Sequence, residues 1–155
     1  MRASDDPSWA LYPNTILAFN SSDHFEIDLR ETVASKKRKY LRAANLDQPF
    51  AVITACNPCG HSHSDLDNVR FANQLEAQVQ QSGLHLVHVD GVSPDRTHRE
   101  SGIAVKISRQ DATTLAKQYN QSAFFWFDGE AFWVVPALVE SAAVRLPIVS
   151  SQTSS

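Results

Sequence analysis

The residues best suited to chemistry lie between Thr54 and Arg70, directly after a short apolar run. Cysteine and histidine side chains cluster there at close spacing. Thiolates and imidazoles are preferred ligands of zinc, and a CxxC pair has the right bite for one zinc ion. One hypothesis is therefore a zinc-binding domain, and zinc is the one cofactor that the residues indicate. The candidate ligands are Cys56, Cys59, His61 and His63.

The same cysteine pair allows a redox hypothesis. A CxxC motif that follows a strand and opens a helix has the placement of a thioredoxin-like site, where the helix N-terminus lowers the pKa of a thiol. The Asn57-Pro58 dipeptide between the cysteines is unusual for such a motif. We therefore rank redox chemistry below metal binding.

The hypothesis that we favour is a binding site for a small anionic or nucleotide-like ligand around residues 54–70. Polar side chains stand there at the ends of predicted elements, and a helix N-terminus presents free N–H groups to an anion. The turn lacks the glycines of a P-loop or a dinucleotide-binding fingerprint, so no nucleotide is specified. Glu100 is the candidate general acid or base. The candidate ligand-binding residues are Thr54, Asn57, Asn68, Arg70 and Gln121, each of which has a purely structural alternative as a capping or bridging group.

The elements that must position these residues follow from local sequence. Phe50–Thr54 is apolar and rich in β-branched residues, which predicts a strand buried on both faces. Ser64 with Asp67 predicts a helix start, apolar residues then recur at three- and four-residue spacing, and Gly83 predicts the helix end.

Further elements can be placed before and after this unit. A hairpin, a basic helix and then the central unit precede two more strands, a second helix and an aromatic hairpin. From Phe50 onward the order is strand, helix, strand, strand, helix, strand. We therefore predict an α+β fold with a split βαβ (ferredoxin-like) core, an added N-terminal hairpin and helix and a C-terminal edge strand. The predicted ranges are strands 15–19, 24–29, 84–89, 103–107, 123–127 and 131–135, and helices 30–45 and 108–119.

The chain has 155 residues, 43% of them hydrophobic and 20% charged, with a net charge of -3. This size and composition predict one globular domain over residues 15–149, preceded by a flexible lead-in over 1–14 and followed by a disordered tail over 150–155. No apolar run is long enough to cross a membrane, and the start of the chain lacks a signal-peptide core. We expect a cytoplasmic protein with no membrane partner.

Two further surfaces invite partner hypotheses. Lys36 to Lys39 are four consecutive basic residues, but consecutive positions point in different directions around a helix, so nucleic-acid binding is unlikely. The aromatic strands around Asp128-Gly129 could anchor a partner, which makes a non-enzymatic protein-interaction module the alternative function. At strand spacing, however, such rings are more often part of the core.

Several motifs resemble the bacterial domain of unknown function 3293 family. They are the Thr54–Pro58 turn (TACNP), the Asn68–Arg70 segment, Glu100 before an apolar strand, and Gln121 closing a helix. The resemblance extends from about Tyr12 to Val135. It implies a fold but no reaction, and the cysteine pair departs from the family pattern.

Overall fold

The computed structural model describes residues 1–149, which form one eight-stranded antiparallel sheet with three α-helices. The strand order is β2-β1-β4-β5-β3-β6-β7-β8. The predicted α+β class is therefore confirmed. The strands are β1 (Ile16–Phe19), β2 (Phe25–Asp28), β3 (Phe50–Thr54), β4 (Leu86–Val92), β5 (Arg99–Val105), β6 (Ala123–Phe127), β7 (Phe132–Pro136) and β8 (Val144–Arg145), and the helices are α1 (Ser35–Ala43), α2 (Asp65–Gln81) and α3 (Arg109–Gln118).

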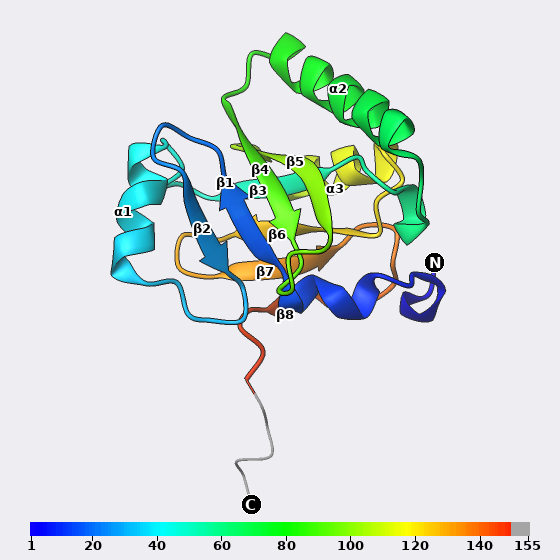
Figure 1. The fold of residues 1–155 in the computed structure, drawn as a ribbon, viewed down its shortest axis with the longest axis horizontal. Helices are drawn as coiled ribbons and strands as arrows, with labels where there is room; N and C mark the ends of the chain where they lie inside the picture. The colour runs from blue at the N-terminus through cyan, green and yellow to red at the C-terminus, as the bar shows by residue number, and fades with distance from the viewer. Residues whose placement is uncertain (150–155) are drawn as a thin grey trace, which may run out of the picture.

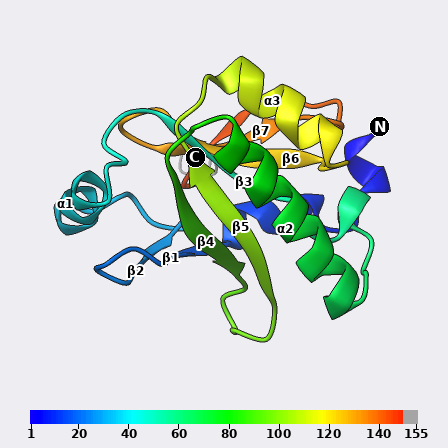
Figure 2. The same cartoon turned by 90° about the horizontal axis from the view of Figure 1, so that it is seen from above.

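The sheet is strongly curled, so that β1 and β2 run across the direction of β6 and β7 (Figure 1). Its two faces carry separate apolar cores. The inner core joins β1, β2 and β4 to β6 and β7 across the curl and receives Leu41 of α1. The outer core lies beneath α2 and α3, which cover the other face of the central strands (Figure 2).

Strand β3 is the centre of the arrangement, as its composition predicts. It pairs with β5 on one side and β6 on the other, both antiparallel. Phe50 and Val52 enter the inner core, whereas Ala51 and Ile53 enter the outer core. This alternation explains the continuous apolar run, because a strand buried on both faces needs no polar positions.

The sequence predicts residues 90–102 as a connection between the predicted strands 84–89 and 103–107, and this prediction is wrong. Strands β4 and β5 extend through most of it and form a long hairpin whose turn spans residues 93–98. Its charged residues make ion pairs on the solvent side: Arg99 with Asp90 at 2.6 Å, and Arg96 with Glu26 of β2 at 2.7 Å. Because these positions are charged, the sequence lacks the apolar pattern from which a strand is recognised.

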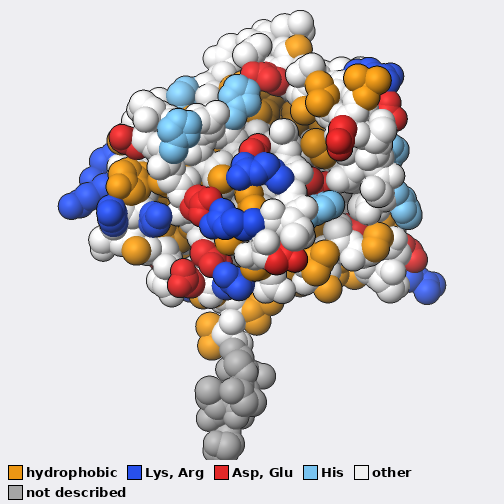
Figure 3. Space-filling model, in the orientation of Figure 1, with side chains coloured by type: hydrophobic (Ala, Val, Ile, Leu, Met, Phe, Trp, Pro, Cys, Tyr) orange, Lys and Arg blue, Asp and Glu red, His pale blue; other side chains and the backbone are white. Residues whose placement is uncertain are grey.

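The basic helix is shorter than predicted and spans Ser35–Ala43. Lys and Arg side chains gather over α1 in Figure 3. The Arg38 guanidinium keeps its charge but is held in place, because it donates hydrogen bonds to the backbone oxygens of Gly129 and Glu130 in the β6–β7 turn. Arg38 thus attaches the helix to the β6–β7 turn.

The aromatic hairpin β6–β7 is part of the core. The four phenylalanine rings of these strands are buried, and the two tryptophans are half-buried against the outer core. The large exposed apolar side chains of residues 1–149 lie elsewhere, at Leu11, Leu66, Val69, Ile148 and Val149. The exposed aromatic patch that an interaction module would need is therefore not formed on β6 and β7.

Residues 1–14, for which the sequence predicted a flexible lead-in, form two short 3-10 helices, Ala3–Asp5 and Trp9–Asn14. The second helix packs Trp9 and Tyr12 against the inner core. The predicted tail over 150–155 lies outside the described residues. Within residues 1–149, no helix is long and apolar enough to cross a membrane.

The predicted start of α2 is confirmed: the Ser64 hydroxyl accepts a hydrogen bond from the Asp67 N–H at 3.1 Å. We expect Ser64→Ala to lower the free energy of unfolding by about 1 kcal/mol, since the N–H loses its partner. Urea unfolding monitored by circular dichroism measures this loss. Ser22→Ala, at an exposed serine in the β1–β2 turn, is the control and should change stability by less than about 0.5 kcal/mol.

Candidate functional site

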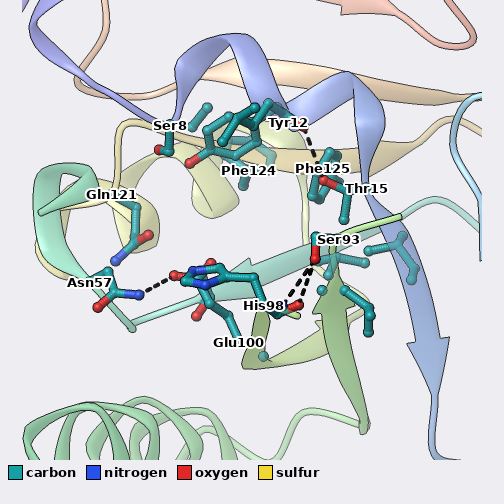
Figure 4. A pocket seen from close by; sticks show the side chains of 18 of the residues that line it. Ser8, Tyr12, Thr15, Asn57, Ser93, His98, Glu100, Gln121, Phe124 and Phe125 are labelled. Atoms are coloured by element: carbon teal, nitrogen blue, oxygen red, sulfur yellow. Dashed lines mark hydrogen bonds between the residues drawn. The ribbon is translucent and has the colours of Figure 1, made fainter. Parts of the chain in front are cut away.

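A cavity of about 310 Å³ opens between the 3-10 helix Trp9–Asn14 and the sheet (Figure 4). It lies where β3 ends, where β5 and β6 begin, and beside the β4–β5 turn. The walls are largely apolar, and polar side chains reach them from four separate segments of the chain. These polar residues include Ser8, Tyr12, Thr54, Asn57, Glu100 and Gln121.

The turn after β3 has an uncommon backbone. Asn57, Cys59 and Gly60 all have positive φ, at 47°, 58° and 75°. Positive φ is costly for residues other than glycine and is tolerated best by asparagine. Backbone of this kind persists only where the surroundings hold it, and it concentrates at functional sites.

Asn57 holds this turn through its side chain. Its Nδ2 donates to Glu100 Oε1 at 2.6 Å, and its Oδ1 accepts from the His63 N–H at 3.0 Å and from Asn68 Nδ2 at 2.9 Å. The backbone N–H of Asn57 in turn donates to Asn68 Oδ1 at 2.9 Å. One amide thus ties the turn to β5 and to the first turn of α2.

Glu100 is the acidic group of the cavity. Burial raises the pKa of its carboxyl, and the nearby Asp6 raises it further, whereas the hydrogen bond from Asn57 and the proximity of His98 lower it. Burial has the largest effect, so the net pKa of the Glu100 carboxyl is raised, because burial disfavours the charged form. A carboxyl poised in this way can accept or hold a proton at the cavity surface.

Gln121 lies just before β6 and is buried, with 3% of its surface exposed. Its Nε2 donates to the backbone oxygens of Cys56 at 3.1 Å and Tyr119 at 3.2 Å. The backbone N–H of Cys59 also donates to Asn120 O at 2.7 Å. The turn after β3 is therefore fastened to the segment before β6.

The wall opposite the sheet comes from residues 1–14. The Tyr12 ring packs on Phe125 with 5.5 Å between centroids. Burial, together with the charges of Asp6 and Glu100, raises the pKa of Tyr12 far above its usual value, so its hydroxyl stays protonated. Asp6 is 4% exposed and accepts from the Ser8 N–H and hydroxyl through Oδ1.

Four of the six acid–base and ligand-binding candidates line this cavity: Thr54, Asn57, Glu100 and Gln121. Thr54 caps the end of β3, because its hydroxyl donates to Ser101 O at 2.7 Å and accepts from the Cys56 N–H at 3.0 Å. Asn68 lies behind the turn as the partner of Asn57. Arg70 does not line the cavity, is exposed and pairs with Asp67 at 2.6 Å.

The cysteine and histidine side chains are not gathered around one point. Both cysteines are free; Cys56 is buried, and burial raises the pKa of its thiol, the reverse of what a reactive CxxC motif needs. The His63 ring stands edge-on to Phe71, and His61 is exposed. Within residues 1–149, no three His, Cys, Asp or Glu side chains are placed to hold a metal ion. The zinc site stays a prediction.

Sequence reasoning missed the residues that close the cavity. Tyr12 and Ser8 lie in the segment assigned to a flexible lead-in, and His98 lies in the misassigned connection between β4 and β5. A signal was present for Tyr12, because Trp9 and Tyr12 are three residues apart and an aromatic pair at that spacing can share one helical face. No comparable signal marks His98.

A family model described as "Protein of unknown function (DUF3293)" matches residues 53–124. The chain resembles that family over this stretch. The resemblance expected from the motifs is therefore confirmed, over a shorter range than Tyr12 to Val135. The match includes Asn57, Glu100 and Gln121, whereas the segment that carries Tyr12 lies outside it. No curated protein and no solved structure matches the chain.

The raised pKa of Glu100 predicts that ionisation of its carboxyl lowers the free energy of unfolding at high pH. Above this pKa the folded protein holds a poorly solvated charge, whereas below the unfolded-state pKa the carboxyl is neutral in both states. We expect Glu100→Gln to raise the free energy of unfolding by up to about 1 kcal/mol near pH 8 and to have no stabilising effect near pH 4, since glutamine keeps an oxygen for Asn57.

Urea unfolding at the two pH values measures the effect. The neighbouring titratable groups are Asp6, Tyr12 and His98, and they are the same in both proteins, so the difference isolates Glu100. Glu31→Gln, at an exposed glutamate, is the matched control and should show no such pH-dependent gain. A loss of stability in Glu100→Gln near pH 8 would show that the ionised carboxyl stabilises the fold.

Proposed function

We propose that the protein binds a small molecule in the cavity between the Trp9–Asn14 helix and the sheet. The observation that supports this proposal best is convergence: Tyr12, Asn57, Glu100 and Gln121 come from four segments and meet at one cavity with apolar walls. Pockets with apolar walls and a few convergent polar groups are typical of ligand sites. The positive-φ backbone at its edge adds weight to the proposal.

The charged residues in the cavity lining limit the charge that a bound ligand can carry. The sequence led us to expect an anionic or nucleotide-like molecule bound near Arg70 and the start of α2. Neither Arg70 nor any residue of α2 lines the cavity, and no lysine or arginine of residues 1–149 does so. We propose that the part of the ligand held here is not an anion. A flat ring of nucleobase type remains compatible with the walls.

We propose binding and assign no reaction. Glu100 is the residue that would transfer a proton if the bound molecule is converted, because its carboxyl faces the cavity and its pKa is raised by burial. Tyr12 stays protonated and so cannot take up a proton, and His98 lies at the exposed edge, which leaves Glu100 as the base that the cavity itself offers.

We also propose that β3, α2, β4, β5, α3 and β6 form a split βαβ (ferredoxin-like) unit inside the larger sheet. The order β4-β5-β3-β6 supports this, with antiparallel neighbours throughout. Helices link β3 to β4 and β5 to β6, as that arrangement requires. The remaining strands would then be extensions at its two edges.

The test uses Gly91, whose side-chain position faces the cavity. A Cβ atom there would meet only Thr15 Cγ2, at 3.6 Å. Gly91→Leu should therefore fill the cavity without removing a hydrogen bond, and Gly91→Ala is the matched control that leaves it open. A small-molecule library is screened by thermal shift against the natural protein and both variants.

We expect compounds that stabilise the natural protein and Gly91→Ala but not Gly91→Leu. Compounds that stabilise Gly91→Leu as much as the natural protein would bind elsewhere, and this result would contradict the proposal. Native mass spectrometry of protein purified without a His-tag or added metal complements the screen. A bound organic mass would support the cavity, whereas a stoichiometric zinc mass would favour the segment from Cys56 to His63.

A further inference from the structure

Two of the polar groups that face the cavity, Gln121 and Glu100, offer free acceptors of hydrogen bonds. Gln121 shows this most clearly. Its Nε2 is committed to the carbonyl oxygens of Cys56 and Tyr119. Since the nitrogen and oxygen of a carboxamide point apart, these two bonds direct Oε1 toward the cavity (Figure 4). Within residues 1–149 no donor makes a hydrogen bond to Oε1, although only 3% of the surface of Gln121 is exposed.

Glu100 provides a second acceptor. Its Oε1 receives the hydrogen bond from Asn57, and within the described chain its Oε2 receives none. Asn57 cannot compete as an acceptor, because its Oδ1 is occupied by the His63 N–H and by Asn68 Nδ2. A ligand therefore meets two free acceptor oxygen atoms, one of them on a carboxylate, beside the protonated Tyr12 hydroxyl.

A second carboxylate, that of Asp6, lies behind the cavity lining and adds to the negative charge near Glu100. Asp6 is buried, and its Oδ2 has no hydrogen-bond partner among residues 1–149. Its negative charge reaches both Tyr12 and Glu100, whose pKa values it helps to raise. With no lysine or arginine in the lining, His98 at the exposed edge is the one side chain there that could become positive.

The remaining walls suit a flat apolar group. The Tyr12 ring packs on Phe125, and Val52 and Val89 lie among the lining residues. Aromatic rings offer large, rigid contact surfaces to a flat ligand. The cavity thus combines largely apolar walls with an end that carries the Glu100 carboxylate and the free Gln121 oxygen.

We propose that the ligand is an organic cation, a flat ring bearing an amidinium, guanidinium or amine group whose N–H groups donate to Glu100 and Gln121. This inference rests on the proposed function and names its ligand class. Hydrogen bonds between a cationic donor and a carboxylate are about twice as strong as neutral ones. An anion of the same shape would face the Glu100 carboxylate, with Asp6 behind the wall and no lysine or arginine in the lining.

Three probes of nearly equal shape test the charge: benzamidine, which is a cation, benzamide, which is neutral, and benzoate, which is an anion. Their affinities are measured by calorimetry near pH 7.5. We expect benzamidine to bind about tenfold or more tightly than benzamide, with benzoate weakest. Gly91→Leu should weaken benzamidine and benzamide alike, which assigns the binding to this cavity.

Glu100→Gln should weaken benzamidine about tenfold while leaving benzamide within about threefold, because glutamine keeps an acceptor but not the charge. Glu31→Gln, the exposed control, should change neither probe. Benzamidine binding should also fall on acidification, because Glu100, whose pKa is raised by burial, takes up a proton and loses its charge. An unchanged preference for benzamidine in Glu100→Gln would overturn the role of this carboxylate.

The outcomes separate the two proposals. If benzoate binds as tightly as benzamidine and Gly91→Leu abolishes both, the cavity stands as a binding site and the cationic ligand is wrong. The cationic ligand is also wrong if no probe binds but the library yields compounds sensitive to Gly91→Leu. If neither the probes nor the library gives binding sensitive to Gly91→Leu, the binding function itself fails.

Discussion

Asn57→Ala is expected to lower the free energy of unfolding by about 3 kcal/mol, since it strips partners from three separate groups. Glu100 Oε1, the His63 N–H and Asn68 Nδ2 all lose the hydrogen bonds that this one side chain makes. Alanine also fits the left-handed backbone of this position less well than asparagine does. Urea unfolding followed by circular dichroism measures the loss.

Asn120→Ala is the matched control. Asn120 is also left-handed, with φ of 56° against 47° at Asn57, but it is exposed, and its side chain makes no hydrogen bond within residues 1–149. We expect a loss of about 1 kcal/mol there, from the backbone alone. Equal losses at both positions would mean that the Asn57 network contributes nothing. Because Asn57 supports the fold, a binding defect in Asn57→Ala would not locate the site, and the Gly91 variants serve that purpose.

Gly60→Ala is expected to cost about 3 kcal/mol and to release residues 1–14 from the sheet. Gly60 has φ of +75°, and a methyl group there would overlap Asp6 Oδ1. Asp6 is buried and held by Ser8, so it cannot yield without losing both hydrogen bonds. The backbone accounts for about 1–2 kcal/mol and the displaced carboxylate for the rest. Chymotrypsin cleavage at Trp9 or Tyr12 reports the release.

Gly83→Ala separates these two contributions. Gly83 has φ of +72° but no atom within 4 Å of the added Cβ, so only the backbone cost of about 1–2 kcal/mol applies. Cleavage near Tyr12 should not increase in this variant. In an Asp6→Ala background, the additional loss caused by Gly60→Ala should disappear. If it persists there, the overlap with Asp6 is not the cause.

The central unit of the fold could be predicted because its signals are local. The apolar run of β3 needs only its own sequence to be recognised, and the Ser64 cap of α2 is complete within four residues. Asn57, Glu100 and Gln121 could be chosen as candidates because they stand at the ends of predicted elements. That all three line one cavity is known from the structure.

What the sequence could not supply depends on distant contacts. Two prolines and two adjacent acids before Thr15 have the composition of a loose segment, and only packing on Phe125 makes Tyr12 part of a wall. The apolar periodicity used to predict α2 includes Leu66 and Val69, yet their side chains are 74% and 55% exposed. The buried residues of α2 are Leu75 and Val79 in its second half.

The position of β1 in the sheet has a consequence for synthesis. Residue 16 pairs with residue 92, so the hairpin formed first at the ribosome lacks its second neighbour until β4 has been made. Until then the stacked rings of Phe19 and Phe25 have no β4 beside them. Pairings between distant segments slow folding and leave apolar surface open to aggregation. Heterologous expression should therefore yield more folded protein when translation is slowed by lower temperature.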